Sequence, residues 1–186
     1  MTLSGLLPVI TADPDLQLAL DQATQTPALG GDLVAPAALR PVLVSALAGP
    51  GPAVAGVTVA VTATAREAEE LAAAVGSLLG PERVGYFPAW ETLPHERLSP
   101  RPDTSGQRLA ILRRLAHPDP SDARSGPLLV LATPVRSLLQ PMVSGLGELE
   151  PVKLAASVSA SLDDTVARLV DIGYARVDMV ERRGEL

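Results

Sequence analysis

The chain is poor in the residue types that build catalytic or metal centres. It has no cysteine and only two histidines, His95 and His117, so we expect no zinc site. Glu91 and Glu96 lie close together in a proline-rich loop, where solvated or capping carboxylates are more common than a catalytic acid pair. Neither a Gly-x-Ser-x-Gly motif nor a Ser/His/Asp set is recognisable. We therefore expect no catalytic and no metal-binding residue in this segment.

Nucleotide chemistry would need a phosphate-binding loop, in which backbone amides and a lysine hold the phosphates. The turn where such a loop is expected reads Val34-Ala35-Pro36-Ala37-Ala38-Leu39-Arg40, without glycine, lysine, serine or threonine. The chain's only lysine, Lys153, lies far from this turn, and Pro36 removes a backbone donor. The glycines between 49 and 56 follow a helix and precede a strand, the reverse of a dinucleotide loop. We expect no cofactor in this segment.

Three arginines near the C-terminus, Arg176, Arg182 and Arg183, are the candidate partner-binding residues. Arginine forms bidentate contacts with carboxylates and is enriched in protein interfaces. The neighbours of these arginines include three acids, Asp178, Glu181 and Glu185. The residues alone leave two interpretations open: an ordinary solvated rim of charges, or a polar patch for a protein partner.

Three of the chain's four aromatic residues, Tyr86, Phe87 and Trp90, fall within five positions. They lie where an apolar strand meets the proline-punctuated loop WETLPHERLSPRPD. In a chain that is 2% aromatic, this clustering indicates either an anchor at the end of the core or a contact surface. We expect Phe87 and Trp90 to anchor the loop over the C-terminal edge of the sheet, with Trp90 at least half-buried.

The elements that must position these residues alternate between apolar strands and amphipathic helices. Strands are predicted at 32–34, 57–61, 84–87, 128–132, 152–155 and 174–180. Helices are predicted at 37–48, 134–140 and 162–172. Three more are predicted from a capping residue: one from Asp13-Pro14 onward, one from Thr64 to 79, and one from Asp103 or Thr104 to 116. Asp13 has the position of a helix cap, and Thr64 with Glu67 has the spacing of a capping box. The alternation predicts an α/β fold, with a mostly parallel sheet and helices on both faces.

Composition is compatible with one domain, or one domain and part of another, because 47% of the 186 residues are hydrophobic. No apolar run is long enough to cross a bilayer, the first residues lack the basic start of a secretory signal, and cysteine is absent. We therefore expect a cytoplasmic protein with no membrane partner. Residues 1–80 carry two arginines against seven acids, and residues 81–186 carry thirteen basic against fourteen acidic groups. Without a basic stripe, nucleic-acid binding by this segment alone is not expected.

Several motifs resemble those of one family. Trp90-Glu91-Thr92-Leu93-Pro94, followed by Ser99-Pro100, Asp103 and Arg108-Leu109, is similar to the N-terminal module of bacterial transcription-repair coupling factors. That module is itself similar to the repair protein UvrB. The resemblance continues in VLATPVRSLL (130–139), in GYARVDMV (173–180) and in Gly184-Glu185. It covers the chain from residue 84 onward, whereas residues 33–79 match only in the order of their elements and the first thirty residues match nothing we can name.

The resemblance implies three parts. Residues 1–30 would be an N-terminal extension with a helix. Residues 31–140 would be a degenerate RecA-like domain, similar to UvrB domain 1a but without its phosphate loop. Residues 141–186 would be the truncated beginning of a UvrA-binding domain similar to UvrB domain 2. One arginine of the family's UvrA surface follows the position matched by Gly184-Glu185, beyond Leu186.

The resemblance also implies a function. Members of the family are ATP-dependent DNA translocases whose motor, with its ATP and magnesium, lies outside this segment, as do the contacts with RNA polymerase and DNA. For this segment it implies recruitment of UvrA to stalled RNA polymerase without catalysis, with Arg176, Arg182 and Arg183 as contact candidates. Two alternatives remain open. A stand-alone nucleotide-binding α/β enzyme is disfavoured by the missing phosphate loop, and a UvrB-like repair protein by the short loop WETLPHERLSP, which stands where UvrB has a long aromatic hairpin.

Overall fold

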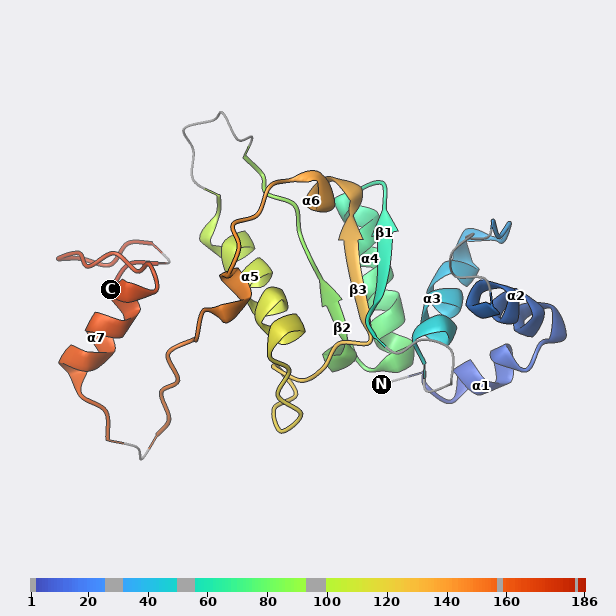
Figure 1. Cartoon of the computed structure of the whole chain (residues 1–186), viewed down its shortest axis with the longest axis horizontal. Helices are drawn as coiled ribbons and strands as arrows, with labels where there is room; N and C mark the ends of the chain where they lie inside the picture. The colour runs from blue at the N-terminus through green and yellow to red at the C-terminus, as the bar shows by residue number, and fades with distance from the viewer. Residues whose placement is uncertain (1–2, 26–31, 50–55, 93–99, 157–158, 183) are drawn as a thin grey trace.

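The computed structural model describes residues 3–25, 32–49, 56–92, 100–156, 159–182 and 184–186 (Figure 1). A small parallel sheet lies in the middle of the molecule, between helices. The helices are α1 (Leu6–Thr11), α2 (Pro14–Gln25), α3 (Arg40–Ala48), α4 (Ala65–Leu79), α5 (Pro102–Ala116), α6 (Val135–Leu139) and α7 (Leu162–Asp171). Short 3-10 turns are η1 (Ala37–Leu39), η2 (Pro81–Arg83) and η3 (Leu146–Glu148). This architecture confirms the α/β fold class.

The sheet has three parallel strands in the order β1-β3-β2. They are β1 (Thr58–Thr62), β2 (Val84–Tyr86) and β3 (Val130–Pro134). All five residues of the central strand β3 are buried. A strand buried on both faces has a nearly continuous apolar sequence, which explains why this strand was predictable to within two residues.

Helices α3 and α4 cover one face of the sheet. Val130 of β3 and Ala60 of β1 point to this face and pack with Val75 of α4. Helix α4 begins with the predicted capping box: the backbone N–H of Glu67 donates to Thr64 Oγ1 at 3.2 Å, and the backbone N–H of Thr64 donates to the Glu67 carboxylate at 3.1 Å. This local signal confirms the predicted start of α4.

Helix α5 covers the opposite face. Leu131 follows Val130 in the strand and therefore points the other way, where it packs in a cluster with Phe87, Ile111 and Leu128. Gly85 of β2 allows the close approach, because a Cβ at this position would lie 2.7 Å from Ile111 Cδ1. The two apolar clusters confirm that helices lie on both faces of the sheet.

Helices α1 and α2 precede α3 in the described part of the chain. Helix α2 begins where it is predicted to, because Asp13 Oδ1 accepts hydrogen bonds from the backbone N–H groups of Asp15 and Leu16 at 3.0 and 3.1 Å. Helix α1 was not predicted, since its sequence LLPVIT has a proline inside the first turn and no capping side chain. No helix in the described ranges is both long enough and apolar enough to span a membrane.

The chain after β3 leaves the sheet and runs to the far end of the molecule (Figure 1). Turn η3 packs against α5, and an extended segment then leads to α7. Helix α7 begins at Ser161, whose hydroxyl accepts a hydrogen bond from the backbone N–H of Asp164 at 3.3 Å. The helix matches the predicted 162–172 closely. The proposed domain boundary at residue 140 stays a prediction.

Three of the predicted strands are wrong. Residues 32–34 and 152–155 belong to no strand, and Val34 is fully exposed. Residues 174–180 form a single bridge, between Ala175 and Glu185, rather than a strand. Each stretch has the apolar or alternating residues of a strand, but a strand also needs a neighbour that pairs with its backbone, and that neighbour is not visible in a local pattern.

Two helix starts also differ from prediction. Helix α5 begins at Pro102, so neither Asp103 nor Thr104 is its cap, and Arg101 occupies that position without a side-chain hydrogen bond. A proline in the first turn suits this start, because its missing N–H would have no partner in the helix. Residues 37–39 form a 3-10 turn, and α3 begins only at Arg40.

Candidate functional site

The aromatic segment is tied to the carboxyl end of the central strand. Phe87 is 4% exposed, and its backbone N–H donates to the carbonyl of Ala132 at 2.9 Å. Its carbonyl accepts from the hydroxyls of Thr133 and Ser137 at 2.8 and 3.1 Å. Strand β3 and helix α6 thus fix the start of the loop at the edge of the sheet. His95 and Glu96 lie outside the described residues.

Arg108 of α5 is the centre of this region. Its guanidinium carbon lies 4.1 Å from the ring centre of Phe87 and 4.2 Å from that of Trp90. The side chain is 1% exposed, and burial lowers the pKa of the guanidinium. Nη1 donates to the carbonyl of Pro88, whereas Nε and Nη2 have no hydrogen-bond partner among the described residues. Within the described residues, the faces of the two aromatic rings are therefore the main partners of the charge.

Polar contacts close the loop on either side of the Trp90 ring, which is partly buried. The backbone N–H of Trp90 donates to the side-chain oxygen of Gln140 at 2.7 Å, and the Gln140 amide donates back to the Trp90 carbonyl at 3.0 Å. The Thr104 hydroxyl donates to the Glu91 carboxylate. Gln140 and Thr104 therefore hold Trp90 and Glu91 in place, whereas Glu96, the other carboxylate of the acid pair considered from the sequence, lies outside the described residues.

The candidate partner-binding arginines lie in the C-terminal segment. Arg176 and Arg182 are exposed, and Arg183 lies outside the described residues. The Glu185 carboxylate accepts hydrogen bonds from the backbone N–H groups of Glu181 and Arg182 at 2.8 and 2.9 Å, and these bonds lower the pKa of Glu185. Glu185 is thus a local turn cap.

Backbone pairing holds the two arginine-bearing stretches together. The backbone N–H of Ala175 donates to the carbonyl of Gly184 at 2.8 Å, and that of Leu186 donates to Ala175 at 2.9 Å. The stretch with Arg176 therefore lies beside the residues that follow Arg182. Arg182 also lines an open cleft of about 710 Å³ between the start of α5 and residues 172–185.

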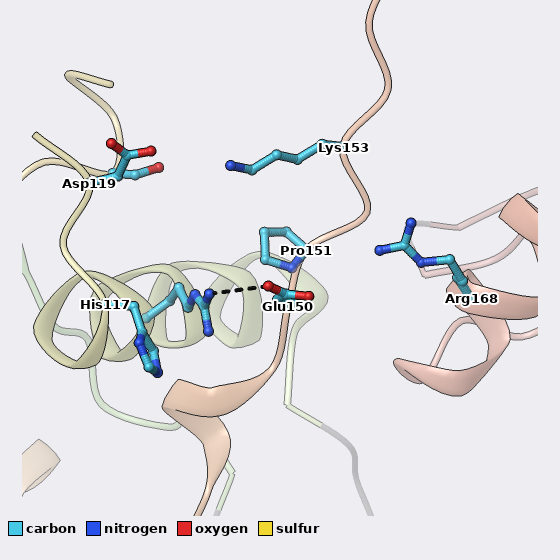
Figure 2. Close-up of a pocket in the computed structure, with 8 residues that line it drawn as sticks. His117, Asp119, Glu150, Pro151, Lys153 and Arg168 are labelled. Carbon is cyan, nitrogen blue, oxygen red and sulfur yellow. Dashed lines mark ion pairs between the residues drawn. The ribbon is translucent and has the colours of Figure 1, made fainter. Parts of the chain in front are cut away.

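A second group of basic residues was not predicted from the sequence. Arg113, His117, Lys153 and Arg168 line a cavity of about 270 Å³ next to the end of α5 (Figure 2). Arg113 and His117 are one helical turn apart, which the sequence reveals, but Lys153 and Arg168 reach the cavity from the linker and from α7. No local pattern could have placed these two side chains beside α5.

Comparisons with known proteins were consistent with one family. No family model matches the chain. The chain is 49% identical over 184 residues to the transcription-repair-coupling factors of Mycobacterium bovis and Mycobacterium tuberculosis. The match covers 98% of this chain but only 14% of each relative, so the chain spans about one seventh of their length. Along nearly its whole length, the chain is therefore similar to an N-terminal segment of the transcription-repair-coupling factors.

Proposed function

We propose that this segment is a protein-binding module that recruits the excision-repair protein UvrA to stalled RNA polymerase, with no catalysis of its own. The observation that carries the proposal is the 49% identity to transcription-repair-coupling factors along nearly the whole chain. UvrA as the partner rests on the motif resemblance described for residues 84–186. RNA polymerase and DNA would be contacted by other parts of the longer protein, in the cytoplasm.

Arg176, Arg182 and Arg183 are the proposed contacts. Arg176 and Arg182 are exposed, and the pairing of Ala175 with residues 184–186 presents them on one firm segment. An exposed guanidinium that becomes buried against a carboxylate on binding contributes much more to affinity than one that stays at the solvated rim.

The test is a calorimetric titration of the 186-residue chain with purified UvrA. Arg176→Glu and the double change Arg182→Glu plus Arg183→Glu should each weaken binding about tenfold or more. Arg66→Glu is the matched control, because Arg66 lies at the start of α4 with 87% of its side chain exposed. Unchanged affinity in all the C-terminal variants would show that these arginines are only a solvated rim.

The absence of catalysis is tested separately. The turn at residues 34–40, where a phosphate loop would be needed, lacks glycine, lysine, serine and threonine. We therefore propose that ATP and magnesium belong to the motor of the longer protein. Titration with magnesium-ATP should give no heat above that of dilution. Saturable binding to this chain would contradict the assignment.

A further inference from the structure

The cavity in Figure 2 brings the region around the end of α5 together with the linker and α7, which lie further along the sequence. The end of α5 supplies Arg113 and His117, the turn after it supplies Asp119 and Ser125, the linker supplies Glu150 to Lys153, and α7 supplies Arg168. The fold thus brings together basic side chains that are far apart in the sequence.

The positive charges of this cavity are only partly neutralised. Arg113 Nη2 lies 3.7 Å from the Glu150 carboxylate, a long contact to a side chain that is 76% exposed. Asp119 already accepts hydrogen bonds from the backbone N–H and the hydroxyl of Ser121 at 3.0 and 2.6 Å. Lys153 and Arg168 form no ion pair within 4.0 Å with any residue that the structure describes. Two cations therefore remain available to an incoming anion.

An apolar groove continues directly from this cavity. It measures about 340 Å³ and shares Arg113, Glu150 and Pro151 with the basic cavity. Its apolar lining includes Leu109, Ala110, Leu149, Ile172 and Tyr174. The combined site therefore offers an apolar strip along α5 with basic groups in the cavity, and Arg114 and Arg124 add basic groups to the groove.

We propose that this combined site binds an acidic peptide segment of a partner protein. Carboxylates of the peptide contact Arg113, Lys153 and Arg168, and an adjacent apolar side chain lies in the groove over Leu109 and Ile172. An incoming carboxylate displaces the loosely held Glu150 from Arg113, because arginine binds carboxylates best in a bidentate geometry. The groove adjoins the cleft lined by Arg182 and shares Leu109, Ile172 and Tyr174 with it. The basic cavity includes neither Arg176 nor Arg182, so an acidic ligand held by Lys153 and Arg168 goes beyond the proposed recruitment of UvrA.

The charges around the cavity favour a peptide over a nucleic acid. A phosphate backbone needs a run of cations that releases counterions along its length. Here Asp119, Glu148 and Glu150 interrupt the basic residues, and the whole chain has a net charge of −6. A short segment with two or three carboxylates fits between these acids, whereas a continuous polyanion meets like charges on either side.

The probe is a fluorescein-labelled synthetic peptide with three side-chain carboxylates and an amidated C-terminus, Glu-Asp-Glu-Leu-Leu, titrated with the 186-residue chain and followed by anisotropy. The double change Lys153→Glu plus Arg168→Glu should weaken binding about tenfold or more. The control Arg66→Glu makes the same type of charge reversal on α4 and should change affinity less than about twofold. Glu150→Gln should tighten binding about threefold, because it removes the competing carboxylate.

Further measurements separate the contribution of the apolar groove from that of the basic cavity. A peptide with both leucines replaced by serine should bind more weakly, because it cannot use the groove. Inorganic phosphate and single-stranded DNA, added as competitors, should displace the peptide only at much higher concentration. Circular dichroism checks that each variant is folded. We expect the double variant to fold, because Lys153 and Arg168 are exposed.

Several outcomes would overturn the inference. They are the absence of saturable peptide binding, equal affinity in the double charge reversal, weaker binding to Glu150→Gln, and displacement by phosphate or DNA at the same concentration as the peptide. The assay contains no UvrA, so its failure and a failure of UvrA recruitment are distinguishable.

Discussion

Arg108 carries a charge inside the core, and among the described residues its guanidinium faces two aromatic rings and no carboxylate forms an ion pair with it. A buried charge costs several kcal/mol unless other groups replace its lost hydration. Here the rings of Phe87 and Trp90 face the guanidinium, and the carbonyl of Pro88 accepts one hydrogen bond. The residue joins α5 to the loop that follows β2.

Arg108→Ala should destabilise the chain by about 3 kcal/mol, because it leaves a cavity between two rings and removes both stacking contacts. The free energy of unfolding in urea measures the effect. Arg108→Lys should also be destabilising, since an ammonium lacks the planar surface that stacks on both rings. Arg66→Ala should change stability by less than about 0.5 kcal/mol, because it removes only an exposed ion pair. A similar loss in Arg108→Ala and Arg66→Ala would contradict the role given to Arg108.

Glu91 gives a prediction about pH. Burial opposes its ionisation, but hydrogen bonds from Thr104 and from backbone N–H groups outweigh burial and lower the pKa of Glu91. A carboxyl whose pKa is lower in the folded state stabilises the fold above its unfolded pKa of about 4.3 and loses that contribution as the pH falls through the folded value.

Glu91→Gln keeps an acceptor for Thr104 but does not titrate. The urea midpoint of this variant should therefore fall less than that of the wild type between about pH 6 and about pH 3. An unchanged slope in Glu91→Gln would mean that Glu91 is not coupled to folding.

At the scale of elements, the contact between α5 and β2 depends on Gly85. A Cβ there would lie 2.7 Å from Ile111 Cδ1 and 3.1 Å from Leu128 Cδ1, closer than packed atoms tolerate. The side chains of Ile111 and Leu128 would have to shift, alone or together with the helix. Gly106 of α5 has open space where its Cβ would be. Substitution by alanine should therefore change the stability of the chain in opposite directions at Gly85 and at Gly106.

Gly85→Ala should destabilise the chain by about 1–3 kcal/mol through overpacking. The loss should be smaller in an Ile111→Val background, because that change removes the atom that the new Cβ meets, and a double-mutant cycle in urea measures the difference. Gly106→Ala should instead stabilise the chain by about 0.5–1 kcal/mol, since it adds helix propensity without a clash. Additive losses for Gly85→Ala and Ile111→Val would contradict the close contact.

The elements also show where sequence reasoning succeeds and where it fails. Helix α4 was predictable because the capping box of Thr64 and Glu67 is local, and β3 because burial on both faces leaves an apolar run. The stretch 174–180 has a strand-like alternation yet forms one bridge, since pairing depends on what lies beside it in space. For the same reason the basic cavity around Lys153 and Arg168 could not be predicted.

At the scale of the whole molecule, turn η3 attaches the start of the C-terminal part of the chain to α5. Gly147 lies so close to α5 that a Cβ would be 3.0 Å from the carbonyl oxygen of Leu112 and 3.2 Å from Ala116 Cβ. The Glu148 carboxylate meets His117 Nε2 at 2.6 Å, next to the negative end of the helix dipole of α5. These contacts fasten the start of the linker that carries Lys153 and leads to α7.

Gly147→Val should release this linker, because the branched side chain meets backbone atoms of α5 that cannot move aside. Trypsin cleaves after Lys153, so cleavage in the linker reports its release. If the linker must open before trypsin can cleave it, a decrease of about 1.4 kcal/mol in the free energy of this local opening should accelerate cleavage about tenfold. The urea midpoint of the sheet should change much less, since β1, β2 and β3 lie away from η3.

Gly106→Ala in α5 is the control and should be cleaved at the rate of the wild type. If Gly147→Val is cleaved no faster, the linker is free without this contact, and α7 is placed by other interactions.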